Sequence, residues 1–401
     1  MGAEVEMGRR RLLGAVAAGA VAGAVASGGT ARAARPADLA AAAERGRGGG
    51  ASGRPCYLGT YTSGGSGGRG IGFAAYDGDT GRLTSTRVLE GVADPSFLAL
   101  DPSGRTLYAV DEQDEGGVSA VRLSADGGAR LLGRQPTGGA APCHLSLHPG
   151  GRHLLSANYG SGSVAVHPIG RDGAVGARTD LVRHTGSGPD PERQRGPHAH
   201  QVLTAPDGRY ILAVDLGTDA VHTYRLDEST GRLRHISRAA TRPGAGPRHL
   251  TFHPSGRFAY LANELDDTVV ACRYDPAAGR LTPGAPQPAT VPGPGGGVRN
   301  YPSQVLVTGD GRFAFLANRG RDCLTRYAVR DGGARLELLD AVPVGGAYPR
   351  HIAFSPSGSL LFAANQNSDS VTVFAVDRRS GQLALTGGKF TAPTPVCTVP
   401  A

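Results

Sequence analysis

Short runs of alternating apolar and polar residues recur along the chain as one unit, repeated six times at intervals of 47 to 57 residues. Alternation with a period of two, together with β-branched residues, is typical of strands that bury one face. The clearest copies are 142–158 (PCHLSLHPGGRHLLSAN), 247–263 (PRHLTFHPSGRFAYLAN) and 349–365 (PRHIAFSPSGSLLFAAN). Related copies begin at Pro95, Ala199 and Pro302. The first residue of each copy is called its anchor below.

Each unit predicts a strand, a tight glycine turn, a returning strand, a polar loop and two further short strands. A glycine stands nine residues after every anchor, where it supplies the turn geometry. Four strands in a unit of this length form one blade of a β-propeller. Residues 57–61 and 71–76 would supply outer strands of a seventh blade, and 395–399 its inner strand. The predicted fold is therefore an all-β, seven-bladed propeller in which pairing of the two terminal strands closes the ring and removes exposed sheet edges.

Composition narrows the function classes. The 63 glycines and 28 prolines among 401 residues disfavour helices. The net charge is +8, but the basic residues are dispersed and only 5% of residues are aromatic, which argues against a nucleic-acid-binding protein and suits a small anionic ligand. No run approaches 18 apolar residues, so a polytopic membrane protein is excluded. Five cysteines without a C-x-x-C pair indicate neither a disulfide scaffold nor a metal site, and we expect no metal or cofactor.

The first 54 residues have the composition of a targeting segment. Residues 8–14 (GRRRLLG) open a weakly hydrophobic, Ala- and Gly-rich run, and 30–33 (TARA) offer a cleavage site. We interpret 1–33 as a twin-arginine-type export signal, 34–54 as a flexible linker and 55–401 as the propeller domain. This predicts an exported protein that meets the twin-arginine translocon during export and is not stably inserted in the membrane. The alternative is an uncleaved tail on a cytoplasmic enzyme.

The repeat also predicts where a site lies. The strand after the anchor runs about five residues at roughly 3.3 Å each and then returns. The residue after the anchor and the Asp or Asn sixteen residues after the anchor therefore lie at the same end, in a ring around a central mouth. Positions that recur are interpreted as structural. The corner Asp or Asn bonds its own turn, and the second residue after the anchor bonds the neighbouring blade: His144, Gln201, His249, Gln304 and His351.

Positions that deviate between copies carry the candidate chemistry. The first residues after the anchors are Ser96, Cys143, His200, Arg248, Ser303 and Arg350. The residues after the corners are Glu112, Tyr159, Leu216, Glu264, Arg319 and Gln366. One blade therefore places Arg248 and Glu264 at the mouth, with His200 on the preceding blade. We predict His198, next to the insertion 186–195, together with Arg299 and Arg350, as substrate-binding residues. A carboxylate, an imidazole and several guanidinium groups at one concavity suit anion binding and proton transfer; the alternative is a structural salt-bridge network.

Several motifs together resemble a known family. They are 57–62 (YLGTYT), 197–201 (PHAHQ), 246–250 (GPRHL), 262–264 (ANE), 301–303 (YPS), 349–352 (PRHI) and 393–397 (PTPVC). Over residues 55–401 the chain resembles the propeller lactonase family, which includes bacterial 6-phosphogluconolactonase and the fungal carboxymuconate-lactonising enzyme. The resemblance implies a seven-bladed propeller that acts on lactones through a His, an Arg and a Glu, which match His200, Arg248 and Glu264. An export signal is unusual for an enzyme of a cytosolic sugar-phosphate pathway. Whether the substrate carries a phosphate group therefore stays open.

The expected reaction is hydrolysis of a sugar lactone, with a small anionic lactone or sugar acid as the binding partner. Glu264, or His200 if neutral, would activate the water. Arg248 would stabilise the oxyanion, and Arg350 and Arg299 would hold a phosphate or carboxylate. Two alternatives stay open. One is a lactonising cycloisomerase, which would turn over cis,cis-muconates. The other is a non-catalytic exported propeller that binds lactones or a partner without opening the ring.

Overall fold

The computed structural model describes residues 53–291 and 297–401. In these residues the chain forms seven antiparallel sheets, six of them four-stranded and one five-stranded. Each sheet is one blade, and the order of strands along the chain follows the predicted repeat. The segment interpreted as an export signal lies outside the described residues, as does all of the predicted linker except its last two residues. Within the described part, no helix has the length and hydropathy needed to cross a bilayer.

The first three blades contain β4 (Leu98–Leu100), β5 (Thr106–Asp111), β6 (Gly117–Leu123), β7 (Ala129–Pro136); β8 (Pro142–Leu147), β9 (His153–Asn158), β10 (Ser163–Pro168), β11 (Asp180–Arg183); and β12 (Ala199–Thr204), β13 (Ile211–Asp215), β14 (Ala220–Asp227), β15 (Arg232–Ala240). The fourth and fifth contain β16 (Pro247–Phe252), β17 (Phe258–Asn263), β18 (Thr268–Asp275), β19 (Arg280–Pro288); and β20 (Tyr301–Val307), β21 (Phe313–Arg319), β22 (Cys323–Arg330), β23 (Arg335–Pro343). The sixth contains β24 (Pro349–Phe354), β25 (Leu360–Asn365), β26 (Ser370–Val376), β27 (Leu383–Leu385), β28 (Phe390–Thr391), and the seventh combines β29 (Pro395–Pro400) with β1 (Arg54–Thr60), β2 (Ile71–Tyr76), β3 (Leu83–Leu89). Two single 3₁₀ turns, η1 (Asp331–Gly333) and η2 (Gln366–Ser368), accompany them.

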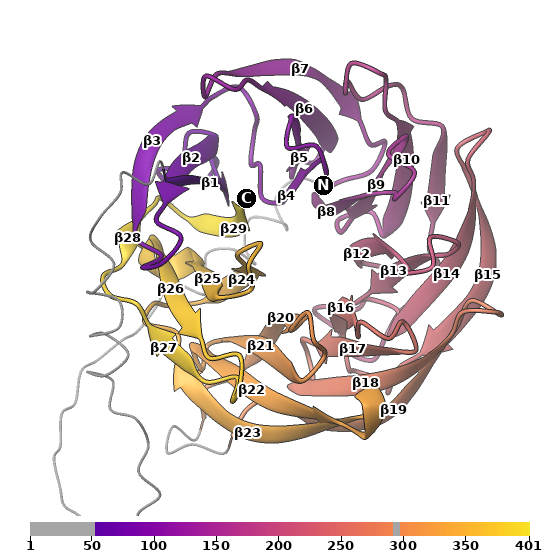
Figure 1. The fold of residues 1–401 in the computed structure, drawn as a ribbon. Coiled ribbons are helices and arrows are strands. Elements are labelled where there is room, and N and C mark those ends of the chain that lie inside the picture. Colours follow the sequence, from indigo (N-terminus) through magenta and orange to yellow (C-terminus); the bar gives the residue numbers. More distant parts are fainter. Residues whose placement is uncertain (1–52, 292–296) are drawn as a thin grey trace, which may run out of the picture. The chain divides into compact units, whose positions relative to one another are not determined.

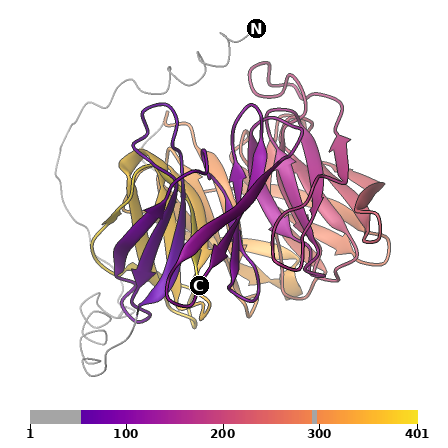
Figure 2. The ribbon, with the colours of Figure 1, turned by 90° about the horizontal axis from the view of Figure 1, so that it is seen from above.

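The blades close into a ring as predicted. Each innermost strand contacts the innermost strand of the next blade, from β4 round to β29 and back to β4 (Figure 1). The seventh blade is the one built from both ends of the chain: β29 pairs antiparallel with β1, with Tyr57 opposite Val399. β1 begins at Arg54, the last residue of the predicted linker. Seen from the side, the strands run between two faces of the ring (Figure 2).

The glycine turns adopt the conformation that the repeat predicts. All six repeat glycines have φ between +67° and +72°, a region in which a Cβ is disfavoured; they are Gly104, Gly151, Gly208, Gly256, Gly311 and Gly358. These turns lie at the face opposite to the predicted mouth. The returning strand therefore brings the corner residue back to the end where the bend after the anchor lies.

The hydrophobic core lies between the blades and not at the centre of the ring. Each of the seven clusters of buried apolar side chains in the described residues joins two neighbouring blades. Leu212 of β13, for example, belongs to one cluster with Leu250 of β16 and Leu261 of β17. Because the apolar packing is completed in these wedges, the innermost strands are free to carry polar side chains toward the centre, and four of these are buried histidines: His144, His200, His249 and His351.

Candidate active site

A β-bulge opens the innermost strand of five blades directly after the anchor. In each case the pairing with the second strand skips one residue. The skipped residues are Cys143, His200, Arg248, Ser303 and Arg350. A bulge leaves the extra residue outside the ladder and re-aims its side chain. The positions that deviate between the repeats are therefore the positions that the backbone releases from the sheet.

Glu264 follows β17 directly, and its carboxylate is buried among three guanidinium groups. Oε1 accepts a hydrogen bond of 2.7 Å from Arg193. Oε2 lies 2.5 Å from Nη2 of Arg319 and 2.9 Å from Nε of Arg248. The side chains of Glu264, Arg248 and Arg319 are at most 4% exposed. The two residues that the repeat placed at one end of the fourth blade, Arg248 and Glu264, are thus in direct contact.

The three arginines keep Glu264 ionised. Burial alone would raise the pKa of its carboxyl, but Arg319, Arg193 and Arg248 outweigh burial and hold the pKa well below its usual value. Both carboxylate oxygens are already engaged by guanidinium groups. A proton added to Glu264 would have to displace these ion pairs, so the residue is a poor proton acceptor.

Arg248 lies where positive charge is in excess. Its Nη1 donates a hydrogen bond to the backbone carbonyl of Ser303, and its Nε lies near Glu264 without a well-aligned hydrogen bond. Burial, followed by the like charges of Arg319 and Arg350, lowers the pKa of Arg248 to about 9. The guanidinium remains charged at neutral pH, and its environment favours the arrival of an anion.

His200 is the bulge residue of β12 and is buried in the same neighbourhood. Its ring centroid lies 5.5 Å from that of Tyr159 and 5.3 Å from that of His249. Burial, and then the nearby charge of Arg248, lower the pKa of His200 well below its usual value. The ring is therefore neutral at pH 7, and its buried Nδ1 has no hydrogen-bond partner within the described residues. A neutral imidazole has one nitrogen that can accept a proton.

His198 and the insertion 186–195 contact Tyr159, and the insertion also contacts Glu264. The ring of His198 stacks on Tyr159 with centroids 4.5 Å apart, and its Nδ1 lies 2.8 Å from the Tyr159 carbonyl oxygen. The Tyr159 hydroxyl accepts a hydrogen bond of 3.2 Å from Arg193, which comes from the insertion. The insertion therefore reaches Glu264 through Arg193, and His198 holds the tyrosine that lies between His200 and this arginine.

Arg350 forms a second, smaller charge cluster. Its Nη2 lies 4.0 Å from Oε2 of Glu112, and its Cζ lies 5.7 Å from the ring centroid of Tyr61. The Tyr61 hydroxyl donates to Glu112 at 3.0 Å. Burial raises the pKa of Glu112 in spite of Arg350. The positive charge of Arg350 is consequently only partly compensated.

Arg299 lies at the rim. Its side chain is 58% exposed and its Nη2 is 4.0 Å from Oδ2 of Asp190, in the insertion. Its Cζ lies 5.0 Å from the ring centroid of Tyr301. The structure thus separates the predicted substrate-binding arginines into a partly buried one, Arg350, whose side chain is 17% exposed, and an exposed one that contacts the insertion.

Three of the five recurrent positions after the anchors bond the neighbouring blade. The prediction is wrong for His144 and His249, whose buried Nδ1 atoms have no hydrogen-bond partner within the described residues. Three of the second residues after the anchors accept a hydrogen bond from the next blade, as predicted: Gln201 from the Leu250 N–H at 2.6 Å, Gln304 from the Ile352 N–H at 2.9 Å and His351 from the Thr398 N–H at 3.3 Å. The corner residues are structural. The predicted bond to their own turn is confirmed for Asp215, whose Oδ1 accepts a hydrogen bond of 2.9 Å from the Thr218 N–H, but it is wrong for the four asparagines. Their amides donate to hydroxyl groups on the third strand of the blade and not to their own turn: Asn158 to Ser163, Asn263 to Thr268, Asn318 to Thr325 and Asn365 to Thr372.

Sequence reasoning did not assign roles to Arg193, Arg319, Glu112 and Tyr61. Arg319 and Glu112 belong to the deviating series after the corners, so the repeat contained a signal for them. Arg193 lies in an insertion that has no counterpart in the repeat, and its contact with Glu264 spans 71 residues. No spacing rule predicts a contact of that kind.

Comparison with known proteins places these features in context. A family model described as "Lactonase, 7-bladed beta-propeller" matches residues 55–400. The protein named 6-phosphogluconolactonase from Bacillus subtilis is 34% identical over 348 residues, covering 85% of this chain and 96% of that protein. The structure of a periplasmic gluconolactonase from Pseudomonas aeruginosa aligns with a TM-score of 0.80 at 33% identity, covering 87% of this chain and 99% of that one. A protein structure from Lactobacillus plantarum aligns with a TM-score of 0.80 at 32% identity, covering 86% and 98%.

Proposed function

Because the chain belongs to the seven-bladed β-propeller lactonase family, we propose that it is an enzyme that hydrolyses a sugar lactone to the open-chain acid. A relative at 34% identity is named 6-phosphogluconolactonase, which supports this substrate class. The observation that carries the proposal is a buried excess of guanidinium groups beside a neutral imidazole.

The charges at the mouth do not balance. Four guanidinium groups face three carboxylates: Arg193, Arg248, Arg319 and Arg350 against Glu112, Glu264 and the buried Asp94, whose charge acts on Glu112. Electrostatic interactions are strong in such a desolvated site, so the excess charge attracts an anionic substrate and stabilises negative charge that develops during reaction. The same cations disfavour a metal ion, and arginines already engage Glu264.

His200 is the better candidate for the general base. Guanidinium groups occupy both carboxylate oxygens of Glu264, whereas His200 is neutral and its Nδ1 has no partner within the described residues. In the proposed reaction, the ring of His200 accepts a proton from water as the water oxygen bonds to the lactone carbonyl carbon. The imidazolium then returns the proton to the ring oxygen as the carbon–oxygen bond breaks, which gives the hydroxy acid.

Arg248 is proposed to stabilise the oxyanion of the tetrahedral intermediate. A donor in such a position contributes about 3–4 kcal/mol to the transition state. Glu264 orients Arg248 together with Arg319 and Arg193, and it acts as a positioning residue. Arg350, and Arg299 at the rim, hold the phosphate or carboxylate of the substrate through bidentate hydrogen bonds.

A pH-stat assay tests the proposal with gluconolactone, with and without a 6-phosphate, after subtraction of spontaneous opening. Arg248→Ala and His200→Asn should each lower kcat by at least about a hundredfold. Arg257→Ala, on the exposed glycine-turn face, is the matched control and should turn over normally. Near-normal turnover by both mouth variants would refute the assignment. Turnover of cis,cis-muconate would point to a cycloisomerase, and binding without ring opening to a non-catalytic protein.

We further propose that residues 1–33 direct export and that the lactone is met outside the cytoplasm. The relative described as a periplasmic gluconolactonase supports this location. The amino-terminal sequence of the protein recovered from cell fractions tests it, since export predicts a mature chain that starts after Ala33 outside the cytoplasm.

The ratio of kcat/KM for the two lactones tests which substrate group Arg350 and Arg299 bind. A preference for the phosphorylated lactone assigns them to a phosphate, and a preference for gluconolactone assigns them to the sugar.

A further inference from the structure

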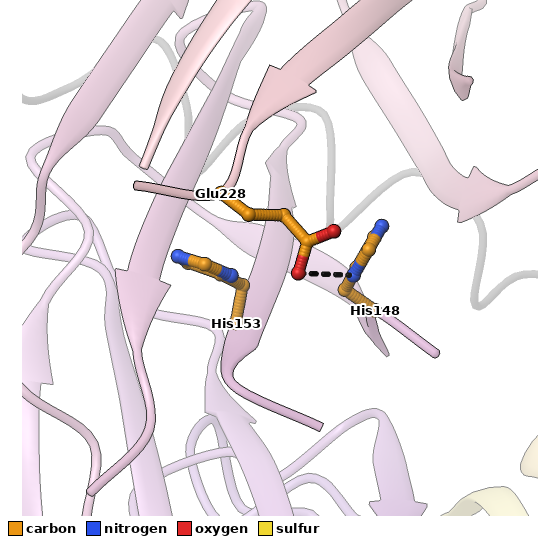
Figure 3. Close-up of side chains that lie close together, drawn as sticks. All are labelled: His148, His153 and Glu228. Carbon is orange, nitrogen blue, oxygen red and sulfur yellow. Dashed lines mark ion pairs between the residues drawn. The ribbon is translucent and has the colours of Figure 1, made fainter. Parts of the chain in front are cut away.

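A second cluster of chemically competent side chains lies at the glycine-turn face, between the second and third blades (Figure 3). Among residues 53–291 and 297–401, it is the one group of three or more His, Cys, Asp or Glu residues whose ligand atoms all lie within 4.8 Å of one another: His148, His153 and Glu228. His148 follows β8 and His153 begins β9, so both lie at the opposite end of these strands from the bulge residue Cys143. The cluster is therefore separate from the mouth.

In His148 the proton lies on Nε2, so Nδ1 is the nitrogen that can bind a metal ion. Its Nε2 lies 3.3 Å from the carbonyl oxygen of Gly208 in the third blade. Because a carbonyl only accepts, Nε2 carries the proton and Nδ1 presents its lone pair. Nδ1 lies 3.9 Å from Oε2 of Glu228 and accepts a bond of 3.2 Å from the Gly150 N–H. A backbone carbonyl bound to the far nitrogen is the arrangement that orients metal-binding histidines.

His153 supplies a second candidate ligand nitrogen. The residue is 5% exposed, and its buried Nδ1 has no hydrogen-bond partner within the described residues. Figure 3 shows the two imidazole rings on either side of the Glu228 carboxylate. A buried polar atom of this kind is rare without a partner or an unseen ligand.

The fourth blade contains an internal comparison. His253 occupies the position of His148 in the repeat, and its Nε2 contacts the Gly311 carbonyl oxygen at 3.2 Å in the same way. Its Nδ1, however, is bonded to the Ser255 hydroxyl at 2.8 Å. Phe258 stands where the second blade has His153. The inter-blade contact is thus common to both blades, and in both of them Nδ1 accepts a hydrogen bond from the backbone N–H two residues later. The difference is that in the fourth blade a hydroxyl group also bonds Nδ1.

Gly150 creates the space for the cluster. The other five repeats carry a side chain at this position: Ser103, Asp207, Ser255, Asp310 and Ser357. A Cβ on Gly150 would stand 2.8 Å from Oε2 of Glu228 and 3.2 Å from Nδ1 of His148. The second blade therefore lacks the side chain that fills the equivalent space elsewhere, and the vacated position lies between two of the candidate ligands.

We propose that His148, His153 and Glu228 bind a divalent transition-metal ion of the zinc class, which fastens the second blade to the third. Two imidazoles and one carboxylate suit zinc and leave a fourth position for water. Ligand atoms around a tetrahedral zinc ion lie about 3.4 Å apart. The 3.9 Å between Nδ1 and Oε2 closes to this value by rotation of Glu228, which is 42% exposed. Arg152, 3.3 Å from Oε2 and 69% exposed, is the competing partner that turns into solvent.

Calorimetric titration of the metal-free full-length protein with Zn²⁺ tests the proposal, and the visible absorption of Co²⁺ reports tetrahedral coordination. One equivalent should bind. Gly150→Ser restores the arrangement of Ser255 in a turn that accepts serine, and Glu228→Gln removes the carboxylate; each should weaken binding at least tenfold. Ser255→Gly is the matched control, which removes the hydroxyl group bonded to His253 Nδ1 without creating a site and should bind one equivalent as the wild type does.

Zn²⁺ should also raise the Tm of the wild type and of Ser255→Gly, but not that of the two site variants. Lactone turnover by Gly150→Ser should equal that of the wild type, because the cluster lies away from the mouth. Absence of saturable binding by the wild type, or equal affinity in the wild type and both site variants, overturns the proposal.

Discussion

Replacement of Glu264 by glutamine removes one negative charge from the centre of the arginine cluster and leaves the shape of the side chain almost unchanged. Arg248 and Arg319 are then buried without a counter-charge, because their Glu264 contacts at 2.9 and 2.5 Å are lost as ion pairs. Removing one partner of a buried ion pair costs about 3–5 kcal/mol. Arg193 is 35% exposed and can turn toward water, so its contribution is at most about 1 kcal/mol.

Glu264→Gln should therefore lower the free energy of unfolding by about 3–5 kcal/mol, measured by urea denaturation followed by circular dichroism. The matched control is Glu337→Gln, whose ion pair with Arg330 is about half exposed and is screened by water, so its loss should leave stability nearly unchanged. A loss no larger than that of the control would show that the Glu264 pairs are not desolvated, and the reasoning about the site would be wrong.

The same variant separates a positioning role from a base. If Glu264 only orients the arginines, Glu264→Gln lowers kcat at least about a hundredfold across the whole pH range but keeps the acid limb of the pH profile. His200→Asn should instead abolish that limb, which we expect well below pH 6.5 because burial and Arg248 lower the pKa of His200. Loss of the limb in Glu264→Gln, with the limb intact in His200→Asn, would assign the base to Glu264.

Three further predictions follow from burial. Burial lowers the pKa of His144 and His351 to about 3, so below pH 6.5 the unfolded chain binds more protons than the folded protein. The free energy of unfolding should therefore fall as the pH drops from 6.5 toward 3, by about 1.4 kcal/mol per pH unit for each histidine. A constant Tm between pH 6.5 and 4 would contradict this. Gln201→Ala leaves the buried Leu250 N–H unpaired and should cost about 1–3 kcal/mol in urea denaturation, whereas a loss below about 0.5 kcal/mol would show that this bond does not hold the blades. The five cysteines are buried free thiols, and burial raises the pKa of Cys143 to about 12, so a thiol reagent should modify them only after denaturation; rapid labelling of the native protein would show that the blades open.

The architecture could be predicted from the sequence because it depends on short-range patterns that recur in every repeat. Period-two alternation fixes which face of each strand is buried, and a glycine nine residues after each anchor fixes each turn. Arg248 lies near the start of β16 and Glu264 directly follows the neighbouring strand β17, so the repeat register was enough to bring them to the same end. Six copies of one pattern also left a single role for the terminal strands, which was to complete a seventh blade.

The chemistry of the mouth required the tertiary structure. The contact of Arg193 with Glu264 depends on the path of an insertion, and that of Arg319 depends on how two blades are wedged together. The sequence left Glu264 and His200 as equal candidates for the base, and burial among the surrounding charges distinguishes them. Likewise, the repeat marked Gly150 as different from its counterparts, but only the packing of the second blade against the third shows that Glu228 lies beside the space. Hairpin pairing sets positions within a blade, whereas contacts between blades, and the pKa values that follow from them, depend on the whole ring.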